Sequence, residues 1–154
     1  MTVVKKAPST AMLPDGLDDR QRFLHFAELF EAFSNTGELD PAADVPFRAA
    51  MNSIHIGTTL LGRCDGTFTT VRRDYRQVLA TNDDRYCLVR NTGIRESRVT
   101  HRRREFVLRP GSLALLKLDE PFLGVDGTSH KRFTNVHLPM ATLRAMVPAV
   151  SRIV

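Results

Sequence analysis

The chain has 154 residues, a length that suits one domain able to bury a core without disulfide or metal support. No apolar run is long enough to span a bilayer and the N-terminus lacks a secretory signal, so we exclude membrane and secreted proteins and expect a cytoplasmic one. The net charge of +5 combines −4 over residues 1–45 with +9 over residues 46–154, which permits an anionic partner without establishing one.

The first segments in chain order predict an arm, a helix and a connector. Residues 1–17 mix turn-forming residues without apolar periodicity, which is typical of a flexible arm. Residues 18–34 predict an amphipathic helix, with Asp18 and Asp19 at its N-terminus. We expect it to pack on the outside of the main body through phenylalanines at helical spacing: Phe23, Phe26, Phe30 and Phe33. Residues 34–46 are dense in turn residues and form the connector.

From Phe47 onward, short runs rich in Val, Ile, Thr, Leu and Phe alternate with turns. Their regular spacing predicts an antiparallel sandwich or barrel over residues 47–138. The expected strands cover residues 47–57, 58–64, 68–73, 86–91, 97–101, 105–109, 112–118, 122–126 and 131–138. The Asp65-Gly66 pair predicts a hairpin turn. A helical segment over 139–154 follows, starting near Pro139 and interrupted by Pro148.

The most informative segment is 104–116, in which two apolar strands flank the turn Arg109-Pro110-Gly111-Ser112. Proline presets one dihedral angle of such a turn and glycine accepts the positive one. Together with the Phe-rich helix, FRAAMNSIHIGTTLLGRC, YCLVRNTG and LDEPF, this order resembles the sensor domain of AraC-type transcription regulators over roughly Phe23–Met146.

The resemblance implies a cupin-like jelly-roll barrel, mainly β, with an N-terminal amphipathic helix and a C-terminal helical segment. It implies an effector-binding and dimerisation domain, acting as a homodimer on a small-molecule effector. The family contacts DNA through a helix-turn-helix domain; no such pattern is present in this sequence, so we expect that domain to be absent from this chain.

Metal and catalytic signatures are missing from the sequence. The five histidines, His25, His55, His101, His130 and His137, form no His-x-His pair, so we expect no metal and no other cofactor. Cys64 and Cys87 lie in apolar runs and are expected to be reduced core thiols. We therefore expect no enzyme; the alternatives are a stand-alone cupin-type metal enzyme, or a shortened interaction module without its own ligand.

Strand alternation suggests where an effector would bind, because alternate residues of a strand share one face. If one face of two strands points inward, the ligand-binding residues are Tyr86, Leu88, Arg90, Leu113, Leu115 and Lys117. Arg90 and Lys117 would then be buried cations, and a carboxylate-bearing effector would be their partner. The alternative is that both reach solvent near strand ends.

Two basic runs, residues 72–76 and 101–104, raise the question of nucleic-acid contact. Only Tyr75 among them is aromatic, so they offer no stacking platform for single strands. We expect a solvated loop and a solvated hairpin tip.

Overall fold

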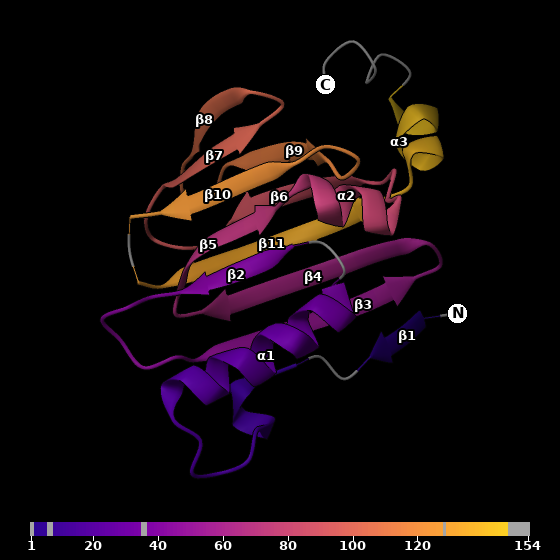
Figure 1. Ribbon diagram of the computed structural model, residues 1–154. Coiled ribbons are helices and arrows are strands. Elements are labelled where there is room, and N and C mark those ends of the chain that lie inside the picture. Colours follow the sequence, from indigo (N-terminus) through magenta and orange to yellow (C-terminus); the bar gives the residue numbers. More distant parts are fainter. Residues whose placement is uncertain (1, 6–7, 35–36, 128, 148–154) are drawn as a thin grey trace.

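Two antiparallel sheets face each other in the computed structural model, which describes residues 2–5, 8–34, 37–127 and 129–147 (Figure 1). The six-stranded sheet has the order β1-β3-β4-β11-β6-β9, and the five-stranded sheet has the order β2-β5-β10-β7-β8. Apart from the hairpins β3–β4 and β7–β8, successive strands lie in opposite sheets, as in a jelly roll. The predicted mainly-β jelly roll with a helix at each end is therefore confirmed.

Eleven strands and three α-helices make up the described part of the chain. The strands are β1 (Thr2–Lys5), β2 (Glu38–Pro41), β3 (Ala49–Ile56), β4 (Thr59–Gly66), β5 (Phe68–Arg73), β6 (Tyr86–Asn91), β7 (Ser97–His101), β8 (Arg104–Leu108), β9 (Leu113–Lys117), β10 (Phe122–Asp126) and β11 (Lys131–Leu138). The helices are α1 (Asp19–Ser34), α2 (Tyr75–Thr81) and α3 (Met140–Met146), with a short 3-10 turn at Thr10–Met12.

Tight turns connect the strands where the sequence carries turn residues. In the Arg109-Pro110-Gly111-Ser112 turn, Gly111 has a φ of +81° and the Ser112 N–H donates to the Arg109 carbonyl at 2.9 Å, as predicted. Arg102 and Arg103, with φ of +52° and +61°, form the two-residue turn of the β7–β8 hairpin. The expected hairpin tip over residues 101–104 is thus confirmed.

Helix α1 is buried more deeply against the barrel than predicted. The Asp18 carboxylate accepts the Gln21 N–H at 2.7 Å and fixes the start of the helix. Phe26 and Phe30 are fully buried in a core cluster shared with both sheets, and Phe30 reaches the space between them. The side chain of Phe33 lies outside the described residues. The helix is therefore part of the core rather than an external attachment.

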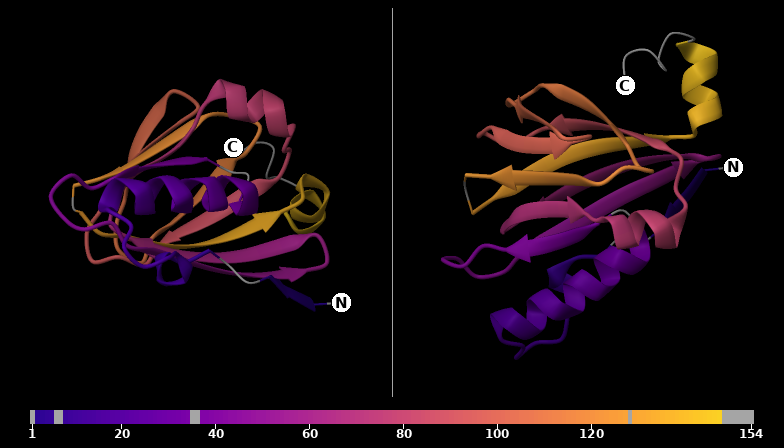
Figure 2. Two further views of the ribbon diagram at one scale, coloured as in Figure 1. Left: turned by 60° about the horizontal axis from the view of Figure 1, so that its bottom comes forward. Right: turned by 45° about the horizontal axis from the view of Figure 1, so that its top comes forward.

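Helix α3 packs on the outer face of the six-stranded sheet, on a different side of the barrel from α1 (Figure 2). Its Leu143 contacts Tyr86, with Leu115, Leu138 and Met140 around them. The predicted start near Pro139 is confirmed, while Pro148 lies outside the described residues. None of the described helices is long and apolar enough to cross a membrane.

The structure differs from expectation in four segments. Within the predicted arm, β1 pairs with β3, and Thr10 is buried with its hydroxyl on the Ala49 carbonyl. The predicted connector contains the edge strand β2, and the predicted loop after β5 contains α2. The Asp65-Gly66 hairpin is wrong: β4 and β5 belong to different sheets, so the chain crosses between layers there.

Candidate functional site

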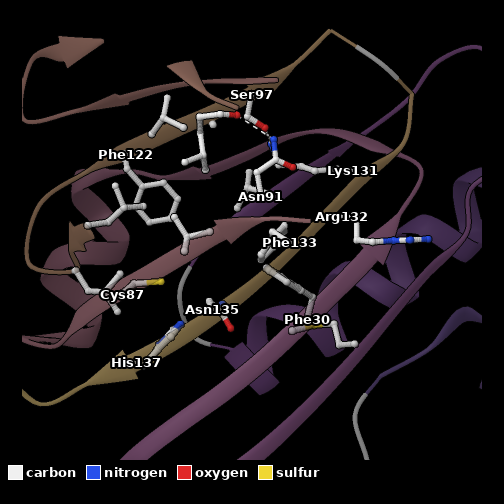
Figure 3. Close-up of a pocket in the computed structure, with 18 residues that line it drawn as sticks. Phe30, Cys87, Asn91, Ser97, Phe122, Lys131, Arg132, Phe133, Asn135 and His137 are labelled. Atoms are coloured by element: carbon white, nitrogen blue, oxygen red, sulfur yellow. Dashed lines mark hydrogen bonds between the residues drawn. The ribbon is translucent and has the colours of Figure 1, made fainter. Parts of the chain in front are cut away.

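A cavity lies between the two sheets, in the interior of the barrel (Figure 3). Its volume is about 80 Å³, and it is partly open to solvent. Strands of both sheets and α1 contribute its walls, which are mainly apolar. A largely apolar cleft or cavity with a few polar groups is the usual form of a small-molecule site.

Strand β11 supplies most of the polar groups of the cavity. Its residues Lys131, Phe133, Asn135 and His137 alternate along the strand and all line the cavity. Lys131 lies at one end, near β7 and β10, and His137 lies at the other end beside Cys87 of β6 (Figure 3). The two ends differ in how well their polar atoms are paired.

Lys131 is a buried cation that already has its counterion. Its Nζ lies 2.9 Å from Oδ1 of Asp126, and both side chains are only 8% exposed. The Ser97 hydroxyl donates to the same carboxylate oxygen and lies 3.5 Å from Nζ. Burial lowers the pKa of Lys131, and the Asp126 charge opposes that shift. This network is electrically neutral and internally hydrogen-bonded.

His137 is only 2% exposed, and neither of its ring nitrogens has a hydrogen-bond partner among the described residues. Burial lowers its pKa to about 4; the charges of Arg85, Arg73 and His55 also disfavour protonation, whereas Asp83 favours it. The imidazole is therefore neutral at physiological pH. A buried polar group without a partner costs about 1–3 kcal/mol, so a hydrogen-bonding partner within the cavity would stabilise the protein at His137.

Asn135 is the second unsatisfied group of the cavity, because its buried Oδ1 has no hydrogen-bond partner in the part of the chain that the structure describes. The amide lies over Gly62 of β4, where a Cβ atom would come within 2.2 Å of Oδ1. Because Gly62 has no Cβ atom, the Asn135 side chain fits against β4 at this position. By contrast, the Asn91 amide donates to the Arg95 and Leu108 carbonyls and accepts the Gly93 N–H, so it is satisfied by the protein.

The two cysteines are buried and unlinked, as predicted. Burial raises the pKa of each thiol to about 12. Cys64 and Cys87 therefore stay protonated at physiological pH, and a protonated thiol is a poor nucleophile and a poor metal ligand.

The prediction that six residues of β6 and β9 line the interior is wrong. The structure does bring them together on one face, as the cross-strand pairs Tyr86–Lys117, Leu88–Leu115 and Arg90–Leu113. That face is the outer one, because the cavity is lined by the alternate residues of these strands, Cys87, Val89, Asn91 and Leu116. Tyr86 and Leu115 instead pack beneath α3.

A carboxylate ligand was expected because Arg90 and Lys117 were expected to be buried cations in the barrel, and the structure does not place them there. Arg90 is exposed on the outer face, and the Lys117 ammonium forms an ion pair with Asp119. The expected alternative, in which both cations reach toward solvent, therefore describes them better. The buried cations are Lys131 and Arg73 instead.

Arg73 belongs to the first basic run, which was expected to be a solvated loop. It is 1% exposed and its Nε donates to the Leu118 carbonyl at 2.8 Å, while its guanidinium also contacts the Thr81 hydroxyl. Burial lowers its pKa. Arg73 thus anchors α2 to the barrel, whereas its neighbour Arg72 is half exposed and pairs with Glu38.

The histidines are dispersed over the molecule. His25 is exposed on α1, the His130 ring lies 2.6 Å from Asp65, and His101 accepts the Lys117 N–H at 3.2 Å. Within the described ranges, no group of three or more His, Cys, Asp or Glu residues could hold a metal ion.

Sequence reasoning missed the functional candidates His137, Asn135, Lys131 and Asp126. One signal was present: residues 131, 133, 135 and 137 repeat a polar or aromatic side chain at period two within the last strand. That period predicts a shared face, and a buried lysine on such a face requires an acidic partner.

Comparison with known proteins supports the fold. No protein-family model and no curated protein matches the sequence. Among solved structures, the AraC-like transcriptional activator CuxR aligns with 84% of this chain at 15% identity and a TM-score of 0.64. The match covers 49% of that protein, so this chain spans about half its length.

Two further solved structures resemble the chain more distantly. The cupin domain of Cnp3 from Schizosaccharomyces pombe matches 67% of this chain and 74% of its own, at 7% identity and a TM-score of 0.48. A predicted oxalate decarboxylase from Thermotoga maritima matches 68% of this chain and 93% of its own, at 10% identity and a TM-score of 0.48. The match to CuxR shows a shared fold, and the arrangement of the strands in two facing sheets is that of a jelly roll.

Proposed function

We propose that this chain is the effector-binding and dimerisation domain of a transcription regulator of the AraC type, with a binding rather than a catalytic role. The observation that carries the proposal is the apolar cavity whose polar groups at His137 and Asn135 lack protein partners. The resemblance to CuxR supports it. The regulator would bind DNA through a helix-turn-helix domain outside this chain.

His137 lies where the wall of the cavity adjoins the residues that hold α3. His137 points into the cavity, while the next residue, Leu138, points outward into the cluster that holds α3. The register neighbours Cys87 and Tyr86 divide in the same way between cavity and α3. We propose that α3 also takes part in the dimer interface. A ligand that shifts this end of β11 and β6 would then shift α3, and with it the dimer equilibrium, as a population change.

A cavity-filling substitution tests the proposal. Gly124 of β10 lines the cavity, and a Cβ atom there would meet its nearest neighbour, Lys131 Nζ, at an ordinary 3.6 Å. We expect Gly124→Leu to fold and to occupy ligand space. The low-molecular-weight extract of the source cells should raise the melting temperature of the wild type by about 5 °C near saturation, but not that of Gly124→Leu.

Val125→Leu is the matched control, because residue 125 lies on the outer side of the same strand and is 39% exposed. It should respond to the extract like the wild type. Sedimentation velocity on the same samples should show a changed dimer fraction wherever the melting temperature rises. An equal response of Gly124→Leu and the wild type would contradict binding in this cavity.

A further inference from the structure

The unpaired polar atoms of the cavity are confined to one end. At the Lys131 end, Lys131, Asp126 and Ser97 satisfy one another, and the Asn91 amide is held by backbone groups. At the other end, both His137 ring nitrogens and the Asn135 Oδ1 lack partners (Figure 3). A polar group of a ligand would therefore gain unpaired hydrogen-bonding partners at the His137 end.

The chemistry of these two groups defines the ligand's polar group. A neutral imidazole carries one N–H donor and one nitrogen acceptor, and the Asn135 oxygen is an acceptor. Residues two apart on one strand face lie about 7 Å from each other, so one small group can reach both. A hydroxyl or amide group, which donates and accepts, matches this set.

The charges around the cavity favour a neutral ligand. The Lys131 cation is matched by Asp126, and Arg85 lies 2.6 Å from Asp83. Arg132, the other cation that lines the cavity, lies 2.5 Å from Asp65. The Arg73 guanidinium donates to a carbonyl and a hydroxyl and does not line the cavity. A carboxylate would thus enter an apolar space without a free counterion, which is strongly unfavourable.

The remaining walls are apolar and come from both sheets and α1. They include Phe30, Val89, Val99, Leu108, Leu116 and Phe122. This surface suits a hydrocarbon body. We propose that the cavity binds an uncharged, largely apolar molecule whose hydroxyl or amide group hydrogen-bonds to His137, with Asn135 as the second partner. The inference rests on the proposed function, since it takes this cavity to be the effector site.

Three probes of one shape test the inference: p-cresol with a hydroxyl, p-xylene without one, and p-toluate with a carboxylate. Each is titrated into the ¹⁵N-labelled 154-residue chain, and NMR shifts of cavity residues give the dissociation constant. We expect p-cresol to bind about tenfold more tightly than p-xylene, which corresponds to one or two net hydrogen bonds, and p-toluate to bind most weakly.

Variants assign the preference to His137. His137→Leu should bind p-xylene as the wild type does and lose the preference for p-cresol, so that p-xylene binding reports an intact cavity. His137→Gln retains a donor and an acceptor and should keep most of the preference. His25→Leu on the exposed face of α1 is the control and should change none of the three constants.

Tightest binding of p-toluate, an unchanged p-cresol preference in His137→Leu, or no shift of cavity residues with any probe would overturn the inference. The two proposals can fail separately. If p-cresol binds with the expected preference but the dimer fraction does not respond to the cell extract, the binding site at His137 is supported and the sensing function is contradicted. If a carboxylate binds in the cavity and shifts the dimer, the sensing role stands and the ligand class falls.

Discussion

Replacing Asp126 by alanine is expected to lower the free energy of unfolding by about 3–5 kcal/mol, as measured by urea denaturation at pH 7. The substitution removes the carboxylate that lies 2.9 Å from the Lys131 ammonium, in a pair whose side chains are each 8% exposed. Lys131 would remain as a buried cation, and among the described residues only the Ser97 hydroxyl would still lie within hydrogen-bond reach. The loss reflects mainly the unpaired charge rather than the intrinsic strength of the pair.

Two comparisons separate that cause from a general loss of packing. The double variant Asp126→Leu/Lys131→Met removes both charges and should recover most of the lost stability. Glu38→Gln breaks the exposed ion pair with Arg72, whose side chains are 44% and 48% exposed, and should cost less than about 1 kcal/mol. If Asp126→Ala cost no more than Glu38→Gln, the buried network would not have the role assigned to it.

Acidification from pH 7 to pH 4 is expected to remove on the order of 3 kcal/mol of unfolding free energy through His137. Its pKa is about 4 in the folded protein, against about 6.5 in the unfolded chain, so the unfolded state binds more protons between these values. Each pH unit in that window costs about 1.4 kcal/mol. The stability is fully present above pH 6.5 and is lost as the pH falls toward 4.

Denaturant titrations at a series of pH values from 7 to 4 check this prediction. The glutamine of His137→Gln does not titrate. The unfolding free energy of this variant should therefore fall less steeply with decreasing pH than that of the wild type, and the difference should equal the contribution of His137. His25→Gln, on the exposed face of α1, should show the wild-type dependence. Equal slopes for His137→Gln and the wild type would show that His137 titrates normally, and would remove the basis for a neutral imidazole in the cavity.

Period-two patterns and turn residues were enough to predict most of the fold. The strands β5, β6, β7, β10 and β11 have the predicted bounds, and the Pro110-Gly111 turn has the predicted geometry. Helix α2 was missed although Asp74 and Gln77 form a capping box, a signal that the sequence contains. Strand β2 was missed because it is short, lies at a sheet edge and ends at Pro41.

The inward face of β6 could not be predicted from alternation alone. Both faces of this strand carry apolar residues, because Val89 lines the cavity while Tyr86 packs under α3. Alternation identifies the inner face only where the other face is polar. The position of α3 removes that contrast, and it depends on the tertiary arrangement rather than on the local pattern.

The pairing of Lys131 with Asp126 and the isolation of His137 also depend on tertiary structure. Asp126 ends β10 in one sheet, and Lys131 begins β11 in the other, so their contact arises from the packing of the two layers. His137 lacks partners because its neighbours across the strands are Cys87 and Leu60, which offer no strong hydrogen-bonding group. Neither relation follows from spacing within a strand.

Native mass spectrometry of the chain purified under mild conditions from its source cells would test directly whether the cavity holds a small molecule. We predict a dimer with an organic adduct that is lost on denaturation, is reduced in Gly124→Leu and is retained in Val125→Leu. A monomer that carries a stoichiometric transition metal and no organic adduct would contradict the sensor domain and favour a cupin-type metal enzyme.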